Sequence, residues 1–347
     1  MVKKNKILFY SSVTNLNLFK ITGFYYYDII ALELSGYHVT TTNTYKDFFK
    51  FWTYDISFLY FYKKSLIPGL ISLFLNKKII YTGGIDEISN EVNIKMVSRC
   101  IYKALFVLNY IISHHCNIVS TKDLENTKKL LVSFGFKKCK KLIYFPHAID
   151  TNNILFQNIS NKENIFTTIC WMGNAENVKR KGVDKAIEIF KIFLTFNKDF
   201  KLFIIGTIGD GTNYLQNIIN KHDLNNNVFF TDSITEIEKI KILQKSLFYF
   251  QISKYEGFGL AVLEAMICNN FIIHSGKGGL IDTIGDNGLK VESKDSYINV
   301  ANSIHNIYQN YSIFSNEIEN NKNYIFQKFD LKDRSMNFNK IIQKNEL

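Results

Sequence analysis

Two glutamates eight residues apart stand in a very apolar part of the chain. Glu256 belongs to a glycine loop that continues through Gly257, Phe258 and Gly259, and Glu264 lies inside the apolar run that follows. An unpaired buried carboxylate is costly, so Glu264 needs a partner. That partner is either a basic residue of the core or the vicinal hydroxyls of a ribose, to which a charged acceptor binds strongly.

The residues around this pair predict a strand, a tight loop and a helix. Residues 248–252 are aromatic and β-branched, which favours a buried strand, and residues 260–268 favour an apolar helix. Gly257 and Gly259 permit a tight turn and a close backbone approach to a small ligand. The free N–H groups at the helix start favour an anionic or polar ligand.

A cluster of cations precedes another predicted helix. Residues 166–172 predict a strand that ends at Gly173, and a loop over 174–179 leads to Arg180, Lys181 and a helix from residue 183. Cations at a helix start oppose the helix dipole, which favours a functional reason for them over simple solvation.

Length and composition predict an α/β protein of two domains. The chain has 347 residues, 46% of them hydrophobic, with only two prolines. Its five cysteines form no Cys-x-x-Cys pair, which favours reduced thiols in the cytoplasm. The apolar stretches are too short for a signal peptide or a membrane span, so we expect neither.

The net charge of +11 is unevenly distributed. Residues 1–150 hold 20 basic and 10 acidic residues, a net charge of +10, whereas the remainder holds 22 and 21. This asymmetry indicates an anionic partner: a membrane surface, a phosphate-bearing acceptor or nucleic acid. Charge that only aids solubility is the simpler alternative.

Strands and helices alternate in both halves, which is typical of doubly wound domains. In the first half, residues 93–113 predict a long helix with interleaved aromatic and basic residues, which either packs on the sheet or rests on anionic lipid. Residues 151–164 are rich in Asn, Ser and Lys and predict a linker. The alternation then restarts, and residues 331–343 predict a last helix.

The stretch from Glu256 to Met266 resembles the glutamate-x7-glutamate signature of retaining glycosyltransferases of family 4, also called group 1 glycosyltransferases. The resemblance implies the GT-B fold, an α/β architecture in which two Rossmann-like domains face each other across a cleft. It divides the chain into an acceptor-binding domain (1–150), a linker (151–164), a donor-binding domain (165–325) and a C-terminal segment (326–347). The final helix is expected to cross back to the first domain.

The resemblance also implies roles for individual residues. Glu256 would orient the donor sugar or balance its developing positive charge, and Lys181 and Arg180 would stabilise the diphosphate. The implied donor-binding residues are Glu264, Gly257, Phe258, Gly259, Gly173, Asn174, Gly206, Gly278 and Gly279. Asp86 and Gly23 are the weaker candidates for the acceptor or sugar side.

Two positions depart from the family pattern. Asn174 stands where family members carry an arginine, and Arg180 is our candidate for the missing charge. Gly83 and Gly84, followed by acidic residues, stand near the place of a histidine that touches the donor sugar. Asp86 would take over a polar contact there or serve only in a turn.

The implied activity is that of a hexosyltransferase (EC 2.4). It would move a sugar, with retention, from a nucleotide-diphosphate sugar to a glycan or lipid-linked acceptor in surface polysaccharide or lipopolysaccharide synthesis. No Asp-x-Asp motif stands in a suitable loop, so we expect a metal-independent enzyme without a cofactor. We expect it in the cytoplasm, held peripherally at the membrane by an anionic lipid surface.

Two other functions remain open at this stage. A GT-B protein that binds nucleotide sugars without catalysis would account for Asn174 and the missing histidine. A nucleic-acid-binding protein would account for the charge but not for the paired glutamates, so we do not expect nucleic acid as a partner. A Rossmann oxidoreductase is excluded because Gly-x-Gly-x-x-Gly does not follow the first predicted strand.

Overall fold

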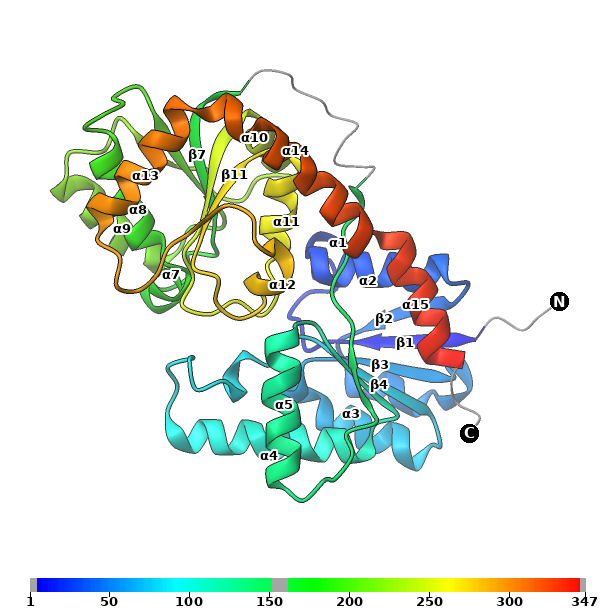
Figure 1. Cartoon of the computed structure of the whole chain (residues 1–347). Helices are drawn as coiled ribbons and strands as arrows, with labels where there is room; N and C mark the ends of the chain where they lie inside the picture. Colours follow the sequence, from blue (N-terminus) through cyan, green and yellow to red (C-terminus); the bar gives the residue numbers. More distant parts are fainter. Residues whose placement is uncertain (1–4, 152–161, 344–347) are drawn as a thin grey trace. The chain divides into compact units, whose positions relative to one another are not determined.

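The computed structural model describes residues 5–151 and 162–343. The chain forms two compact units: unit 1 comprises Met1–Asp150 and Phe329–Leu347, and unit 2 comprises Thr151–Lys328. Each unit contains a six-stranded sheet with helices around it (Figure 1). Most of the predicted linker lies outside the described residues, and the first strand of unit 2 begins at Glu163.

Unit 1 is built on a parallel sheet in the order β2-β1-β3-β4-β5-β6. Its central strands are buried on both faces, which explains their continuous apolar sequences. The strands are β1 (Lys6–Tyr10), β2 (His38–Thr42), β3 (Ile56–Tyr60), β4 (Lys78–Thr82), β5 (His115–Ile118) and β6 (Leu142–Tyr144). The helices, with 3-10 helices labelled η, are α1 (Leu18–Ile21), α2 (Gly23–Leu34), η1 (Tyr45–Phe49), η2 (Phe51–Thr53), α3 (Tyr62–Phe74), η3 (Asp86–Ile88), α4 (Met96–Ile112), α5 (Thr121–Ser133) and α15 (Leu331–Gln343).

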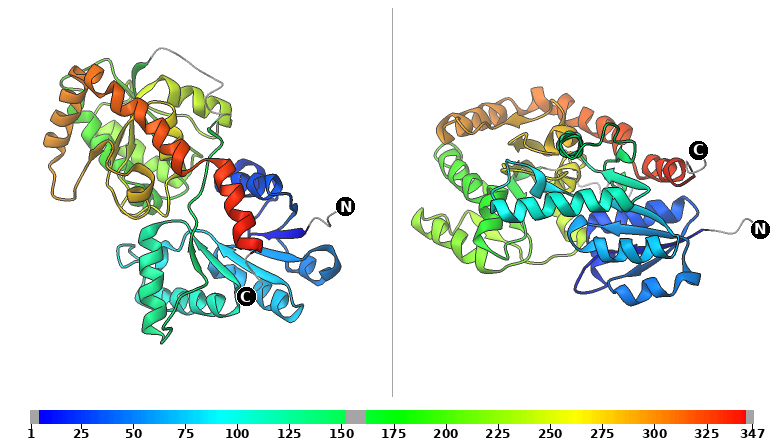
Figure 2. Two further views of the ribbon diagram at one scale, coloured as in Figure 1. Left: turned by 45° about the vertical axis from the view of Figure 1, so that its right-hand side comes forward. Right: turned by 90° about the horizontal axis from the view of Figure 1, so that it is seen from below.

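The last helix, α15, belongs to unit 1, where it packs against α2 (Figures 1 and 2). Its buried Arg334 donates from Nε to Asp28 Oδ1 at 2.5 Å and from Nη1 to the carbonyl oxygens of Phe145 and Pro146. Burial by itself raises the pKa of Asp28. Arg334 and His147 lower the pKa by more than burial raises it, so it lies at about 2. A buried ion pair therefore joins α15 to α2 and to the segment after β6.

Unit 2 is built on a second parallel sheet, in the order β12-β11-β10-β7-β8-β9. Stacked phenylalanines form its core, with the rings of Phe166 and Phe248 4.7 Å apart. The strands are β7 (Glu163–Ile169), β8 (Lys201–Ile205), β9 (Val228–Phe230), β10 (Ser246–Gln251), β11 (Phe271–His274) and β12 (Leu289–Lys290). The helices are α7 (Ala175–Lys181), α8 (Val183–Phe193), α9 (Asp210–Lys221), α10 (Glu236–Lys245), α11 (Leu260–Ile267), α12 (Leu280–Ile284), α13 (Tyr297–Gln309) and α14 (Tyr311–Lys328).

The prediction of a loop over residues 174–179 is wrong, because residues 175–179 belong to the helix α7. The Asn174 side chain caps this helix by accepting from the backbone N–H of Asn177 at 2.8 Å, and Gly182, with φ of 71°, ends it. Arg180 and Lys181 therefore lie in the last turn of α7, where the helix dipole favours cations. The position of Arg180 and Lys181 in the helix is therefore no evidence for a role in the active site. That evidence has to come from the contacts that the two side chains make.

The order of strands in unit 2 reverses between β7 and β10. In open α/β sheets, ligands bind beyond the carboxyl ends of the strands at such a reversal. The segments that follow β7 and β10 contain the cations near Gly173 and the glycine loop of Glu256. The topology therefore brings the two predicted groups to one place within unit 2.

Candidate active site

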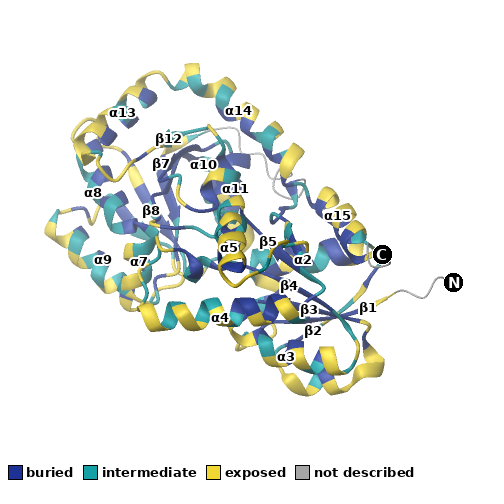
Figure 3. Ribbon diagram, turned by 60° about the horizontal axis from the view of Figure 1, so that its bottom comes forward, coloured by how far each residue is buried: buried dark blue, intermediate teal, exposed yellow. Residues whose placement is uncertain are grey.

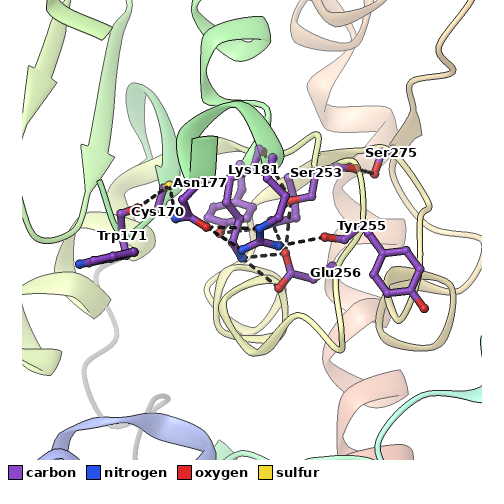
Figure 4. Close-up of polar contacts among 11 residues, drawn as sticks. Cys170, Trp171, Asn177, Lys181, Ser253, Tyr255, Glu256 and Ser275 are labelled. Atoms are coloured by element: carbon purple, nitrogen blue, oxygen red, sulfur yellow. Dashed lines mark hydrogen bonds and ion pairs between the residues drawn. The ribbon is translucent and has the colours of Figure 1, made fainter. Parts of the chain in front are cut away.

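Glu256 and Lys181 form a largely buried ion pair beyond the end of β10 (Figure 4). Lys181 Nζ lies 2.9 Å from Oε1 and 2.7 Å from Oε2 of Glu256. Gln251 Nε2 and Ser253 Oγ also donate to Oε2, at 3.1 and 3.2 Å. Burial raises the pKa of Glu256, but Lys181, Arg180 and the Ser253 hydrogen bond outweigh it and hold the pKa below its usual value. Glu256 is therefore an oriented carboxylate that stays ionised at neutral pH.

Arg180 is fixed beside this pair. Its Nε and Nη2 donate to Asn177 Oδ1 at 3.3 and 2.8 Å, and its Nη1 donates to the carbonyl oxygen of Tyr255 at 3.2 Å. The backbone N–H of Lys254 donates to the Arg180 carbonyl oxygen at 2.8 Å. The end of α7 is thus tied to the loop after β10, and two predicted cations stand at the predicted glutamate.

Asn177 and Trp171 belong to the same site, and sequence reasoning missed both. Asn177 Nδ2 donates to the Trp171 carbonyl oxygen at 2.6 Å, so Asn177 links the segment after β7 to Arg180 (Figure 4). The Trp171 ring is 57% exposed and covers Gly173, where an added Cβ would lie 2.0 Å from a ring atom. Nothing in the sequence marks Asn177, whereas a tryptophan at the end of a predicted strand was a usable signal.

The predicted glycines hold the loops of the site close together. Gly259, with φ of 108°, precedes α11, which begins at Leu260 as predicted, and Phe258 is buried in the same loop. Gly206, with φ of 144°, ends β8 so close to β7 that an added Cβ would lie 2.1 Å from the Cys170 carbonyl oxygen. Both backbones require glycine.

Gly278 and Gly279 pack directly on the loop of Glu256. The Gly279 N–H donates to the Glu256 carbonyl oxygen at 2.7 Å. An added Cβ would lie 2.2 Å from that oxygen at Gly278, and 2.4 Å from the Gly257 carbonyl oxygen at Gly279. The two glycines therefore decide where the Glu256 backbone lies.

Replacing Gly279 by alanine is expected to displace the Glu256 loop, because the new Cβ meets backbone atoms that cannot turn away. The cost should be about 1–3 kcal/mol of stability, with a larger loss of transferase activity. Urea unfolding and an activity assay measure the two effects. The control is Gly135→Ala, after α5 in unit 1, where φ is 89° but an added Cβ would meet nothing within 4 Å. Unchanged activity in Gly279→Ala would show that the loop position is unimportant.

Glu264 lies buried in α11 and pairs with Lys239 of α10, with 2.8 Å between Oε2 and Nζ. Lys239 also lies 2.6 Å from Glu236. Burial raises the pKa of Glu264, and Lys239 opposes this only in part, so the pKa lies above its usual value. The first of the two predicted partners, a basic residue of the core, is therefore present. Sequence reasoning missed Lys239 because the pair forms between two helices.

The acceptor-side candidates lie in unit 1. Asp86 opens η3 beyond β4, and Gly23 is the first residue of α2. A pocket of roughly 250 Å³ is lined by Ile85 and Glu87, on either side of Asp86, and neither Asp86 nor Gly23 lines it. At this pocket Lys63 pairs with Glu87 at 2.5 Å and lies 4.1 Å from the centre of the Tyr102 ring.

No group of three or more His, Cys, Asp or Glu side chains is arranged to hold a metal ion within residues 5–151 and 162–343. The acidic residues of the site are instead paired with lysines: Glu256 with Lys181, and Glu264 with Lys239. The charges at the carboxyl end of β10 are thus balanced by side chains of the protein itself.

The sequence profile of the family "Glycosyl transferases group 1" matches residues 155–324, nearly all of unit 2. Unit 2 is a group 1 glycosyltransferase domain. This match confirms the prediction that the chain is a glycosyltransferase. A comparison with curated protein sequences found no match.

Solved structures similar to this chain confirm the predicted GT-B fold. Anabaena HepE, solved with UDP and glucose, has a TM-score of 0.75 and 16% identity over 98% of this chain and 100% of its own. Sucrose-phosphate synthase from Thermosynechococcus elongatus has a TM-score of 0.72 and 15% identity over 98% and 99%. A glycosyltransferase from Rickettsia africae ESF-5 has a TM-score of 0.71 and 16% identity over 99% and 100%.

Proposed function

We propose that this protein is a retaining glycosyltransferase of family 4 that moves a hexose from a nucleotide-diphosphate sugar to a glycan or lipid-linked acceptor. The reaction would serve surface polysaccharide or lipopolysaccharide synthesis on the cytoplasmic side of a membrane. The observation that carries the proposal is the Lys181–Glu256 pair with Arg180 beside it, at the strand-order reversal of a group 1 glycosyltransferase domain.

The charges of the site suit glycosyl transfer. As the bond between the anomeric carbon and the phosphate oxygen breaks, the diphosphate gains negative charge, which Lys181 and Arg180 would stabilise. The sugar ring gains positive charge, which the ionised Glu256 would balance. The acceptor oxygen bonds to the anomeric carbon on the face that the phosphate leaves, and its proton passes to the departing phosphate oxygen. In this proposal the transfer needs no cofactor.

UDP is our proposed nucleotide, because HepE has been solved with UDP and with UDP-glucose. The rest of the donor would lie along the same edge of the sheet. Glu264 would accept from the ribose, and the loops at Gly173, Gly206 and Gly257 would face the phosphates and sugar. Gly278 and Gly279 would support those loops from behind.

The test is a thermal-shift screen of the wild type with UDP, GDP, ADP, CMP and their sugars. A ligand at about a hundred times its dissociation constant stabilises a protein by about 2.7 kcal/mol, a shift that is easily measured. Stabilisation by UDP and UDP-sugars alone would support the proposed donor. A folded protein that responds to none of these compounds would refute the donor site. Binding without transfer to any offered acceptor would favour the non-catalytic alternative.

Replacing Glu264 by glutamine is expected to weaken UDP binding roughly tenfold to a hundredfold, because a charged acceptor for the ribose is lost. Isothermal titration with UDP measures the effect. The matched control is Glu236→Gln, which removes the other carboxylate beside Lys239 and keeps the Glu264–Lys239 pair. If Glu264→Gln loses stability but binds UDP as tightly as the wild type and the control do, Glu264 serves only the ion pair.

A further inference from the structure

The exposed face of α4 carries no polar side chain. The exposed residues of this helix are Met96, Val97, Cys100, Ile101, Ala104, Leu108 and Ile111 (Figure 3). Met96 and Val97 are 79% and 73% exposed. A helix that covers a sheet normally presents polar residues to water, so this face is the reverse of the usual pattern.

The neighbouring helix α3 also exposes apolar residues. Beyond its first turn, the exposed residues of α3 are Ile67, Leu70, Leu73 and Phe74, and Phe74 is 87% exposed. The two helices pack together, since Asn109 Nδ2 of α4 donates to the Tyr62 carbonyl oxygen of α3 at 2.8 Å. We call the exposed apolar residues of α3 and α4 the apolar face. Exposed contiguous patches of this kind mark interaction sites.

Lysines border the apolar face at its ends. Lys64 lies in the first turn of α3, Lys95 precedes α4, and Lys103 flanks the apolar stripe of α4. None of these three takes part in an ion pair within the described part of the chain. The surrounding unit carries most of the excess positive charge of the protein, +10 within residues 1–150.

An aromatic cluster extends the surface beyond α3. Phe49, Phe51 and Trp52 are 62%, 48% and 70% exposed, and η1, which contains Phe49, packs against α3. Aromatic residues of this kind are enriched where proteins meet the headgroup region of a membrane. Lys46 lies in η1 with Phe49, and Lys50, which pairs with Asp47, follows it in the chain, so the segment repeats the combination of apolar and basic residues.

We propose that the apolar face binds an anionic lipid bilayer, with Ile67, Phe74, Val97, Ile101 and Leu108 in the acyl boundary and the bordering lysines at the headgroups. Such a combination of apolar and basic residues is what interfacial binding requires. A second copy of the chain is a poorer occupant, because it would bring the same lysines against these. None of the described helices is long and apolar enough to cross a membrane.

This inference rests on the proposed function only for the reason why the protein would bind a membrane. A lipid-linked acceptor is confined to the membrane surface, and a face of this kind would bring the enzyme to it. The binding itself depends on unit 1 and not on the donor site, so the two proposals can fail separately.

The test is flotation of the full chain with lipid vesicles. Vesicles of phosphatidylcholine with about one third phosphatidylglycerol should carry the protein, and vesicles of phosphatidylcholine alone should carry at least about tenfold less. Raising the salt concentration should release it, because the Debye length shortens to about 3 Å at 1 M. Equal binding to both vesicles, or to neither, would overturn the proposal.

Variants locate the contact. Val97→Ser, Ile101→Ser and Leu108→Ser together should lower the partition coefficient by about tenfold or more, since buried apolar area sets the strength of interfacial binding. The matched control is Ile237→Ser, Ile298→Ser and Ile313→Ser, which removes side chains of unit 2 that are 54%, 58% and 71% exposed. An equal loss in both sets would show non-specific binding and refute the assignment.

Two further arms complete the design. Lys64→Glu, Lys95→Glu and Lys103→Glu together should abolish the preference for anionic vesicles. Leu70→Ser with Phe74→Ser provides a second apolar variant if the first does not fold. A dimer that the apolar variants dissociate, without any vesicle binding by the wild type, would assign the face to a second copy instead. Stabilisation by UDP should be the same in every variant.

Discussion

Replacing Glu256 by glutamine is expected to lower kcat by about two to three orders of magnitude, and to lower the free energy of unfolding as well, because Lys181 loses its charged partner. The amide keeps the size of the side chain but removes the charge that would balance the reacting sugar, and losses of this size are typical for one such electrostatic contact. Steady-state kinetics with the donor found in the thermal-shift screen measure the effect. Glu176→Gln, on the exposed side of α7, is the control.

The partner of Glu256 gives a second measurement with a definite sign. In Lys181→Met, burial of the Glu256 carboxyl is no longer opposed by the ammonium at 2.7 Å, so its pKa should rise. Activity that requires the ionised Glu256 is lost as the pH falls through that pKa, and the acid limb of the kcat/KM profile should therefore move to higher pH. Lys179→Met, an exposed cation of the same helix, should leave the limb in place. A wild-type profile in Lys181→Met would contradict the proposed role of the ion pair.

Replacing Arg334 by methionine is expected to cost about 3–5 kcal/mol of stability, because Asp28 loses its cation in the core of unit 1 and keeps only the contacts with Tyr60 and His147. Urea unfolding measures this cost, and Lys332→Met, on the exposed side of the same helix, is the control. Adding Asp28→Asn to Arg334→Met should restore part of the loss, since it removes the charge that has lost its cation. If the single and double variants are equally unstable, packing of the arginine rather than the ion pair would be the cause.

The same pair gives a pH dependence. The pKa of Asp28 is depressed to about 2 in the folded protein, below about 3.9 in an unfolded chain. A depressed carboxyl pKa contributes stability that is present above the unfolded value and lost as the pH falls toward the folded value. The wild type should therefore lose this contribution between about pH 4 and pH 2. In Asp28→Asn, urea midpoints should show no such contribution from this group.

Much of the candidate site could be predicted from the sequence, because its strongest signals are local. The aromatic run before Ser253, the glycines at 257 and 259 and the apolar helix after Leu260 each follow from neighbouring residues, and all three elements are present. Gly173 and Gly206 were found at strand ends for the same reason. The strands and most helices of both sheets also followed from periodicity and from glycine positions.

What the sequence could not give are the contacts between distant segments. It offered two partners for Glu264, and the packing of α10 against α11 placed Lys239 there. It placed Arg180 and Lys181 before a helix that begins at residue 183, and α8 does begin there, but the cap from Asn174 also made a separate helix of the preceding loop, so the two cations lie at the favourable end of α7. The link from Asn177 to both Trp171 and Arg180 has no local signal at all.

The sequence by itself determined the two α/β units, the glycine loop and the types of charge at the site, since all of these depend on neighbours along the chain. The tertiary structure decided which charges meet. Parallel strands that are far apart in the sequence end at the same edge of a sheet, so the segments after β7 and β10 become neighbours only when the sheet forms. The exposed face of α4 was also decided by the tertiary structure. Periodicity in the sequence identified an amphipathic helix, but only the packing of the helix showed that its outer side is apolar.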